Sequence, residues 1–369
     1  MVLYENISAV GVGQTYTTMA SWETAKRGDL TAIAHPGYDG YVEVAEIYGG
    51  GALVPANLNI GWTTNATHYI QIRAASGQGH EGYYNTGRAC LVTSSYWPVN
   101  VAYTKVGPGL SIQSTIPVLS TTGSGNLTVD GCIIQCTIYD SVYGAISFNN
   151  GGTHTVKNCT IEITNPTGYT PAINSTISGS QLHVYNCTII NNLHASAYGI
   201  NASSGVTVTS QNNYFNVPSG RTYMGSATYS KGTNDATSNA DAVTTNLRNI
   251  AYSTANFNNV TLGTTNLHLT PTSALRTKGA DLYSLGITTD YEGDARHPGY
   301  LWDIGADQQS DIPLCWNYTA KYKNSSKLYK ASGCGSFPKS LKVPNNVNTN
   351  TGKMVDDGDL IDPRKYTVR

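Results

Sequence analysis

One octet recurs along the chain at a nearly constant step. VDGCIIQC begins at Val129, VKNCTIEI at Val156 and VYNCTIIN at Val184. A degenerate fourth copy, VTSQNNYF, begins at Val208, after a slightly shorter step. A repeat of this length indicates one supersecondary unit that stacks on its neighbours, because a single unit cannot bury its own apolar face.

A second apolar register accompanies the octets. Ile146, Ile173 and Ile200 lie in AISF, AINS and GINA, at equal steps. Apolar and polar residues alternate over short runs that Gly, Asn or Ser interrupts, which is typical of strands. Units of about 24 to 28 residues with two or three short strands predict an all-β fold: a parallel β-helix whose strands pair with their equivalents about 4.8 Å along the axis.

This stacking predicts a role for the cysteines of the repeat. Cys132, Cys159 and Cys187 hold the same place in their octets, so we expect them to form one inward column of small apolar groups, a role that free cysteine fills well. A metal site is disfavoured because no histidine keeps the same phase. Disulfide pairing would leave one thiol over. Cys315 and Cys334 flank a Lys- and Tyr-rich segment and could pair in an oxidising compartment.

Asparagine precedes two of these cysteines, at Asn158 and Asn186. Asn tolerates left-handed backbone and bonds its own main chain, so these positions predict turns. Stacked Asn side chains can also bond to one another along a ladder.

The N-terminal region contains a helical pattern. In TYTTMASWETAKRGDL (15–30), Met19, Trp22 and Ala25 share one side, and Gly28 is a stop signal. A short helix here would cap the open end of the solenoid, which otherwise exposes its core and unpaired strand edges.

The composition narrows the functional classes. Charged residues make up 12% of the chain, the net charge is −1, and 26 Tyr stand against 4 Phe. The chain is not basic enough for a nucleic-acid partner, and it has no apolar run long enough to span a membrane. MVLYENISAVGVG lacks the features of a secretory signal. We therefore expect a β-rich protein that is extracellular or part of a virion, with its signal removed or with another route of release.

The central coils offer little for catalysis. From 110 to 220 the only charged residues are Asp130, Asp140, Lys157 and Glu162, of which Asp130 and Lys157 occupy equivalent positions one coil apart. A glycosidase needs two carboxylates within about 5 to 10 Å, and a lyase needs a base beside carboxylates that hold calcium. Neither set is visible, so we expect no catalytic residues and no cofactor. The histidines of this region are out of phase and are expected to be solvated: His154, His183 and His194.

Tyrosines mark one edge of the coils. Tyr143, Tyr169 and Tyr198 precede the isoleucine register by three, four and two residues, and Tyr139 is close by. Aromatic rings spaced along an elongated surface suit the sugar rings of a polysaccharide. The alternative is that these tyrosines stack on one another and stiffen the loops.

Other segments carry a resemblance. SWETAKRGDL, NIGWTTNATHYIQIRAASGQGHEG and NLHLTPTSALRTKGADLY…TTDYEGDARHPGYLWDIGAD resemble bacterial and environmental right-handed parallel β-helix proteins of the pectate-lyase type, over about residues 15 to 308. The resemblance implies a right-handed coil and a closing turn that ends the last coil. The closing positions are Asp290, Gly293, Arg296, Asp303, Ile304, Gly305 and Ala306.

The closing segment also contains an acidic triplet. Asp290, Glu292 and Asp294 could ligate calcium, whereas the resemblance assigns them to the closing turn with Arg296 as counter-ion. We favour the turn.

Residues 309 to 369 lack the repeat. They resemble carboxy-terminal modules of tailed-phage proteins, and KLYK and SLKV predict a few strands in a small β module that docks, oligomerises or serves as a second cap. Three regions are expected: an N-terminal cap with the first coils (1–55), a parallel β-helix with its closing turn (56–308) and this module (309–369).

Three functional hypotheses follow. The first is a tailed-phage virion protein, a tail spike, fibre or capsid decoration subunit that attaches to surface glycans and is not an enzyme. Its partners would be surface polysaccharide, other virion proteins and copies of itself, since spikes of this architecture are often trimers. The second is a secreted polysaccharide lyase or glycoside hydrolase, and the third is a subunit of an extracellular filament.

Overall fold

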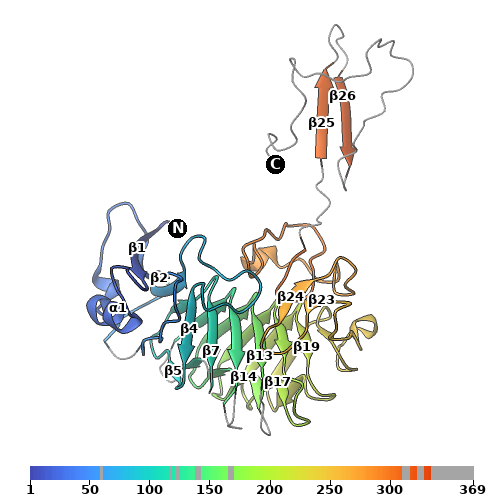
Figure 1. The fold of residues 1–369 in the computed structure, drawn as a ribbon, viewed down its shortest axis with the longest axis horizontal. Helices are drawn as coiled ribbons and strands as arrows, with labels where there is room; N and C mark the ends of the chain where they lie inside the picture. The colour runs from blue at the N-terminus through green and yellow to red at the C-terminus, as the bar shows by residue number, and fades with distance from the viewer. Residues whose placement is uncertain are drawn as a thin grey trace. The chain divides into compact units, whose positions relative to one another are not determined.

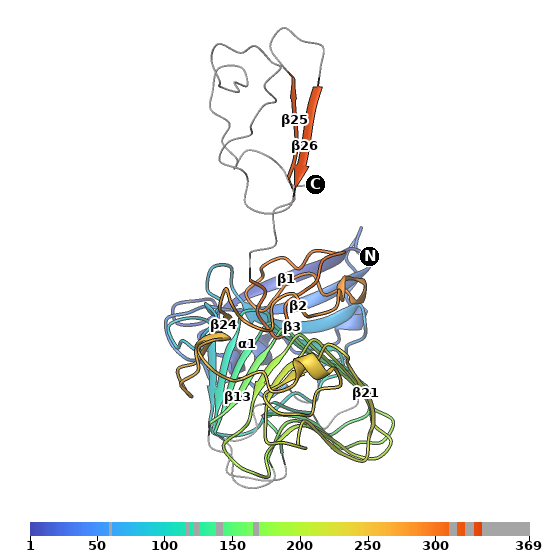
Figure 2. The same ribbon diagram turned by 90° about the vertical axis from the view of Figure 1, so that its right-hand side faces the viewer.

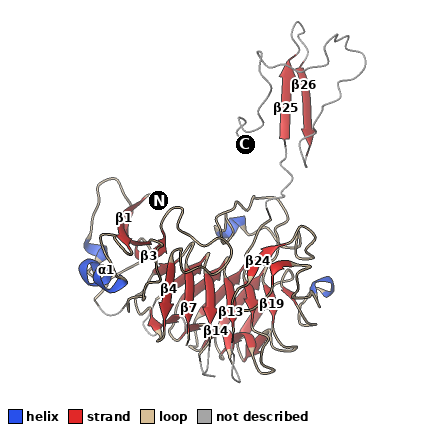
Figure 3. Ribbon diagram, viewed as in Figure 1, coloured by secondary structure: helices blue, strands red, loops and turns tan. Residues whose placement is uncertain are grey.

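Parallel pairing between successive coils organises residues 1–309 (Figure 1). The computed structural model describes residues 1–58, 61–115, 119–121, 125–137, 143–164, 170–309, 316–321 and 328–333. The chain divides into two units, 1–309 and 310–369. Strands dominate the first unit and helices are few and short (Figure 3).

The described residues of the first unit form three stacks of parallel strands. The first sheet has nine strands: β1 (Leu3–Val10), β2 (Gly40–Ile47), β3 (His68–Ala74), β6 (Thr104–Val106), β9 (Leu127–Asp130), β12 (Thr153–Lys157), β15 (Gln181–Tyr185), β18 (Thr207–Gln211) and β21 (Thr228–Lys231). The second has seven: β4 (Cys90–Thr93), β7 (Ser111–Ser114), β10 (Ile133–Cys136), β13 (Thr160–Ile163), β16 (Thr188–Ile190), β19 (Tyr214–Asn216) and β22 (Ala236–Thr237). The third has six: β5 (Trp97–Pro98), β8 (Leu119–Thr121), β11 (Ile146–Phe148), β14 (Pro171–Ser175), β17 (Tyr198–Ala202) and β20 (Tyr223–Gly225).

From β3 to β20 each coil contributes one strand to each sheet in turn, so equivalent residues stack. Val129, Val156 and Val184 pair in the first sheet, and the isoleucine register, Ile146 with Ile173 with Ile200, pairs in the third. This arrangement agrees with the prediction of an all-β solenoid of parallel coils. Figure 2, turned by 90°, shows β13 and β21 on opposite sides of the core.

The fourth octet does not have the register that the sequence pattern predicts. Val208 pairs with Leu182, and Ser210, not Val208, lies opposite Val184. Asn213 therefore takes the place that cysteine holds in the earlier coils, 26 positions after Cys187. A polar residue at an inward position obscured the register in the sequence.

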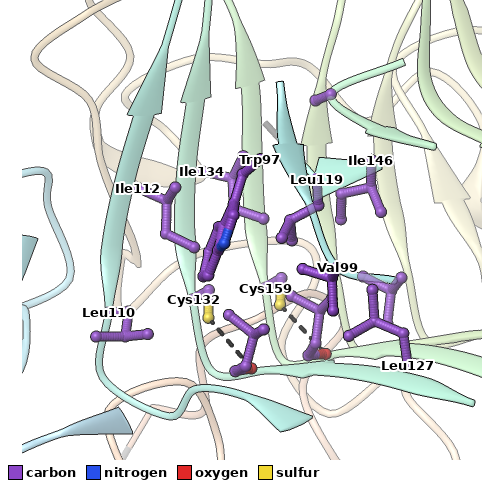
Figure 4. Packing of buried hydrophobic residues seen from close by; sticks show 14 of the residues in the cluster. Trp97, Val99, Leu110, Ile112, Leu119, Leu127, Cys132, Ile134, Ile146 and Cys159 are labelled. Carbon is purple, nitrogen blue, oxygen red and sulfur yellow. Dashed lines mark hydrogen bonds between the residues drawn. The ribbon is translucent and has the colours of Figure 1, made fainter. Parts of the chain in front are cut away.

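The interior column of cysteines lies at the corner between the first and second sheets. Cys132, Cys159 and Cys187 are fully buried free thiols. Each sulfur lies near main-chain oxygens; the Cys159 thiol, for example, is 3.0 Å from the oxygen of Lys157. Figure 4 shows Cys132 and Cys159 side by side beneath Trp97, each with a dashed line to a backbone oxygen. Burial raises the pKa of the Cys132 and Cys187 thiols, so these groups stay neutral.

An asparagine ladder runs along the same corner. Asn158, Asn186 and Asn212 all have left-handed backbone, with φ of 51°, 49° and 60°. The Asn186 amide donates to Asn158 Oδ1 at 3.2 Å, and the Asn212 amide donates to Asn186 Oδ1 at 3.1 Å. Asn158 donates in turn to Asp130 Oδ1 at 2.9 Å. The predicted turn role and the predicted ladder are both confirmed.

His154 is not solvated, contrary to the expectation. It is fully buried and stacks on Phe148 with ring centroids 4.4 Å apart. The Leu127 N–H donates to Nδ1 at 3.3 Å, and Nε2 lies 3.4 Å from the oxygen of Asn150. The alternation was the missed signal, since His154 is two residues before inward Val156 and therefore faces the core too.

The N-terminal helix is present as α1 (Met19–Lys26), with a capping box between Thr18 and Ser21. Met19 and Trp22 join the interior core. Ala25, which was expected on the same side, is exposed. The third buried residue of the helix is Glu23, whose carboxylate accepts the Trp62 indole N–H at 3.2 Å.

Residues 239–309, which we call the cover segment, do not close the last coil. They run back over the outer face of the second sheet, where Phe257 packs on Tyr214 and the Ala306 N–H donates to Thr188 Oγ1 at 3.1 Å. Their regular elements are a hairpin of β23 (Phe257–Asn259) and β24 (Asn266–Leu269) and the 3₁₀ turns at Thr245–Leu247 and Tyr283–Leu285. A third 3₁₀ turn, Leu30–Ala32, follows α1. The resemblance implied a terminal coil, and this expectation was wrong.

The cover segment buries groups that would otherwise be solvated. Glu162 is 2% exposed, accepting bonds from Gln135, from the Gly263 N–H and from the Thr265 hydroxyl. Ile190 and Tyr214 on the same face pack against Leu267, among others. The outer surface of the second sheet is therefore an interface between two layers.

The second unit contains an antiparallel pair, β25 (Trp316–Lys321) with β26 (Leu328–Gly333). The predicted disulfide partners Cys315 and Cys334 lie outside the described residues.

Asn186→Ala should lower the free energy of unfolding by about 2 kcal/mol, because it removes the ladder bonds and places Ala in left-handed backbone, which Asn tolerates better than Ala does. Asn186→Gly is the matched control: it keeps the backbone freedom and loses only the ladder, so its cost should be smaller. Denaturant unfolding monitored by circular dichroism measures both. Equal losses for Ala and Gly would show that backbone conformation contributes nothing at this turn.

His154 should make the protein acid-sensitive. Burial lowers the pKa of His154 to about 4 from its ordinary 6.5. Because the folded pKa is the lower one, protonation favours the unfolded chain. The contribution of neutral His154 is complete above pH 6.5 and falls towards pH 4 by about 1.4 kcal/mol per pH unit.

The free energy of unfolding between pH 7 and 5 should therefore fall less steeply in His154→Gln than in the natural protein. His297→Gln, which removes an exposed histidine, should keep the natural slope. Parallel curves for the natural protein and His154→Gln would contradict the assignment.

Candidate functional site

The predicted tyrosine edge is only partly within the described residues. Tyr139 and Tyr169 lie outside them, and Tyr143 and Tyr198 lie inside. Tyr198 begins β17 opposite Pro171 and is 8% exposed. Its hydroxyl accepts a 2.8 Å bond from Arg221, whose guanidinium lies 5.0 Å from the ring centroid. Tyr198 therefore offers little surface for a sugar ring.

Tyr143 has an aromatic neighbour that sequence reasoning missed. The Tyr96 and Tyr143 rings lie 5.3 Å apart at an interplanar angle of 75°. Tyr96 is 38% exposed and directly precedes Trp97, the first residue of β5. Tyr143 precedes β11, and β8 lies between these strands, so the two tyrosines come from coils two steps apart. Of the predicted column, only Tyr143 takes part in this edge pair, and its partner Tyr96 was not among the predicted residues.

A cavity of about 400 Å³ lies elsewhere, between the early coils and the cover segment. Charged side chains from both sides line it: Glu81, Arg88, Asp130, Asp290 and Glu292. Glu81 and Arg88 form an ion pair. Asp130 pairs with Lys157 at 3.2 Å, as their equivalent coil positions predict.

Sequence reasoning missed this cavity because its walls come from distant parts of the chain, the early coils on one side and the stretch 289–293 on the other. His80 lines it as well, 6% exposed, with its ring 5.3 Å from that of Tyr291. His80 Nε2 bonds the Gly131 oxygen at 3.0 Å. Burial lowers the pKa of His80, so this ring is neutral at physiological pH.

The acidic triplet does not converge as a calcium site would require. Asp290 is 2% exposed, and its Oδ1 accepts the N–H groups of Glu292, Gly293 and Asp294 at 2.9 to 3.0 Å. Its Oδ2 accepts the Gln308 N–H at 3.0 Å. The Asp290 carboxylate therefore organises the turn, and the structure groups Glu292 with His268 and Asp307 instead.

Arg296 holds the end of the cover segment together. It is 1% exposed, and its guanidinium donates to four main-chain oxygens and the Gln308 side chain. The four oxygens belong to Asp303, Gly305, Ala306 and Asp307. Arg296 was expected to be a counter-ion of the carboxylates; among the described residues it forms no ion pair within 4.0 Å, and it acts through carbonyl groups.

Comparisons of the chain with protein-family models, with curated proteins and with solved structures return no match. Within the described residues, every helix is too short or too polar to cross a membrane. The fold defines a parallel β-solenoid with a second, covering layer.

Arg296→Lys should lower the free energy of unfolding by at least about 3 kcal/mol, because one ammonium group cannot replace a guanidinium group that donates hydrogen bonds to several buried carbonyls. Hydrogen exchange should rise across residues 288–308 and stay low in the interior strands. Arg248→Lys is the control, since Arg248 bonds only two oxygens and is partly exposed. Unchanged exchange in Arg296→Lys would contradict this role.

Proposed function

We propose that this protein is a non-catalytic adhesion protein of a virion that binds surface polysaccharide along the loops preceding the third sheet. The observation that supports binding is the pair of Tyr96 and Tyr143, two rings at nearly right angles on one edge of the solenoid. This pair of rings presents apolar surface and hydroxyl groups, and few side-chain rotamers have to be fixed on binding, which suits the binding of sugar rings.

The two rings form one continuous aromatic contact along the solenoid axis. Their coils are two steps apart, about 9.6 Å along the axis, yet the rings approach to 5.3 Å. Aromatic residues recur on this edge at β5, β11 and β17, through Tyr96, Tyr143 and Tyr198, although only the first two present appreciable surface. A linear glycan lying along the axis would contact the first two positions together.

The virion assignment has more general support. A chain with 12% charged residues and abundant Tyr, Asn, Ser and Thr suits an extracellular particle, and a separate unit follows residue 309. We propose a tail spike, fibre or capsid decoration subunit that assembles as a homo-oligomer, with coils of the right-handed kind that the resemblance implies.

A polysaccharide lyase or hydrolase is the second candidate, and the cavity is the observation that favours it. Glu81, Asp130 and Glu292 line it together with Arg88, which are the residue types that protonate or deprotonate sugars. Two of the carboxylates are already paired with cations within the chain, so the adhesion function is the stronger proposal.

Binding can be tested on a panel of immobilised bacterial capsular polysaccharides and lipopolysaccharides. Tyr96→Ala and Tyr143→Ala should each weaken binding of the best ligand about tenfold, equivalent to about 1.4 kcal/mol. Tyr283→Ala, which removes an exposed tyrosine of the cover segment, should bind normally. Equal affinity of all three variants would overturn the proposed edge.

The same incubations should release no oligosaccharide. Products that disappear in Glu81→Gln but persist in Tyr143→Ala would favour the enzyme. Mass spectrometry of purified phage particles from the source material tests the virion assignment separately.

A further inference from the structure

A histidine and two carboxylates meet beside the cavity, apart from the tyrosine edge. His268 comes from β24, Glu292 from the turn that Asp290 organises, and Asp307 from the stretch that Arg296 fixes. One ligand atom from each lies within 4.8 Å of the others. Three rigidly held segments therefore supply one nitrogen and two oxygen donors.

The orientation of His268 is set by a second contact. Nδ1 lies 2.5 Å from Asn266 Oδ1, so Nδ1 carries the proton and the Nε2 lone pair points away from Asn266. A histidine that donates one ring N–H to a side-chain oxygen and offers the other nitrogen is typical of metal ligands.

Nε2 then faces Glu292 Oε2 at 2.5 Å. A contact this short requires a second proton on the ring. A metal ion would take the place of that proton once the Glu292 carboxylate moved away, because bonds of about 2.0 to 2.2 Å hold tetrahedral ligands about 3.3 Å apart. Asp307 adds to the demand for positive charge: it is 3% exposed, and among the described residues it has no ion-pair partner within 4.0 Å. Its Oδ2 accepts only N–H groups, from Leu269 at 2.7 Å and from the Gln309 side chain at 3.5 Å.

Packing holds the ring in place. A β-carbon at Gly82 would lie 1.8 Å from His268 Cε1, so glycine is required where the early coils contact the ring. The Tyr291 ring lies 5.8 Å away on the cover segment.

The neighbouring cavity contains an independent sign of a polar ligand. His80 is buried, lines the cavity, and its Nδ1 has no hydrogen-bond partner within the described part of the chain. Glu292 lines the same cavity, so the cluster has an approach for an ion and room for the open coordination position that three-ligand sites keep.

We propose that His268, Glu292 and Asp307 bind one divalent transition-metal ion of the zinc class, which fastens three stretches of the cover segment to one another. Imidazole with two carboxylates suits zinc, cobalt or manganese, whereas calcium takes six to eight oxygen ligands. The proposal is independent of glycan binding.

The test uses the untagged full chain, stripped with a chelator and titrated with ZnCl₂ or CaCl₂ by calorimetry. One Zn²⁺ per chain should bind and raise the melting temperature, and CaCl₂ should not. Co²⁺ should give the visible absorption of a low-symmetry site with a nitrogen ligand. His268→Gln and Glu292→Gln should each weaken Zn²⁺ binding by tenfold or more, and His297→Gln should not.

If His268→Gln does not fold, Glu292→Gln provides the test instead, because the Glu292 side chain is 23% exposed and its substitution should leave the fold intact. The absence of saturable Zn²⁺ binding would overturn the site, and so would Zn²⁺ binding that survives Glu292→Gln unchanged. Tighter binding of Ca²⁺ than of Zn²⁺, lost in Asp294→Asn, would assign the ion to an oxygen-only site and also overturn it.

Discussion

In-register hydrogen bonding between successive coils is the constraint on which the rest of this molecule depends. Once β9, β12 and β15 pair without a shift, every corner residue lies over its equivalent in the next coil. The thiol column and the asparagine ladder both follow from that register. The ladder also reinforces it, because a slip of one residue would break each Asn–Asn bond and turn inward side chains outward.

The covering layer solves a problem that a bare solenoid leaves open. Irregular backbone that lies on a sheet must find partners for its own N–H and carbonyl groups. Asp290 supplies an acceptor for four N–H groups, and Arg296 supplies donors for four carbonyls. Together they replace the hydrogen bonds that a strand ladder would have provided.

The repeat could be read from the sequence because it is local and periodic. Cysteine, asparagine and isoleucine registers that keep a common step leave few architectures to consider, and the N-terminal helix has ordinary start and stop signals. Polar residues that point inward were harder to place: His154 and Asn213 lie in the core, and Asn213 obscured the register of the fourth octet.

The candidate sites were largely beyond prediction. The cavity lies between the early coils and the cover segment, and the His268 cluster consists of residues from separate stretches of the cover segment. The sequence of the cover segment has no periodicity that relates it to the coils beneath. The Tyr96–Tyr143 contact escaped notice for a related reason, because Tyr96 belongs to the coil of β5, where the octet repeat has not yet begun.

The return path of the cover segment has a consequence for how such a chain can change length. The segment touches the early coils at Gly82 and His80, the middle coils at Glu162 and Thr188, and the late coils at Asn212 and Asn234. An open solenoid can gain or lose a whole turn with little penalty at its flanks. Here the cover segment is matched to a fixed number of coils, so duplication or loss of one coil would displace its contacts along its whole length. The solenoid therefore cannot grow by simple repeat expansion unless the cover segment lengthens as well.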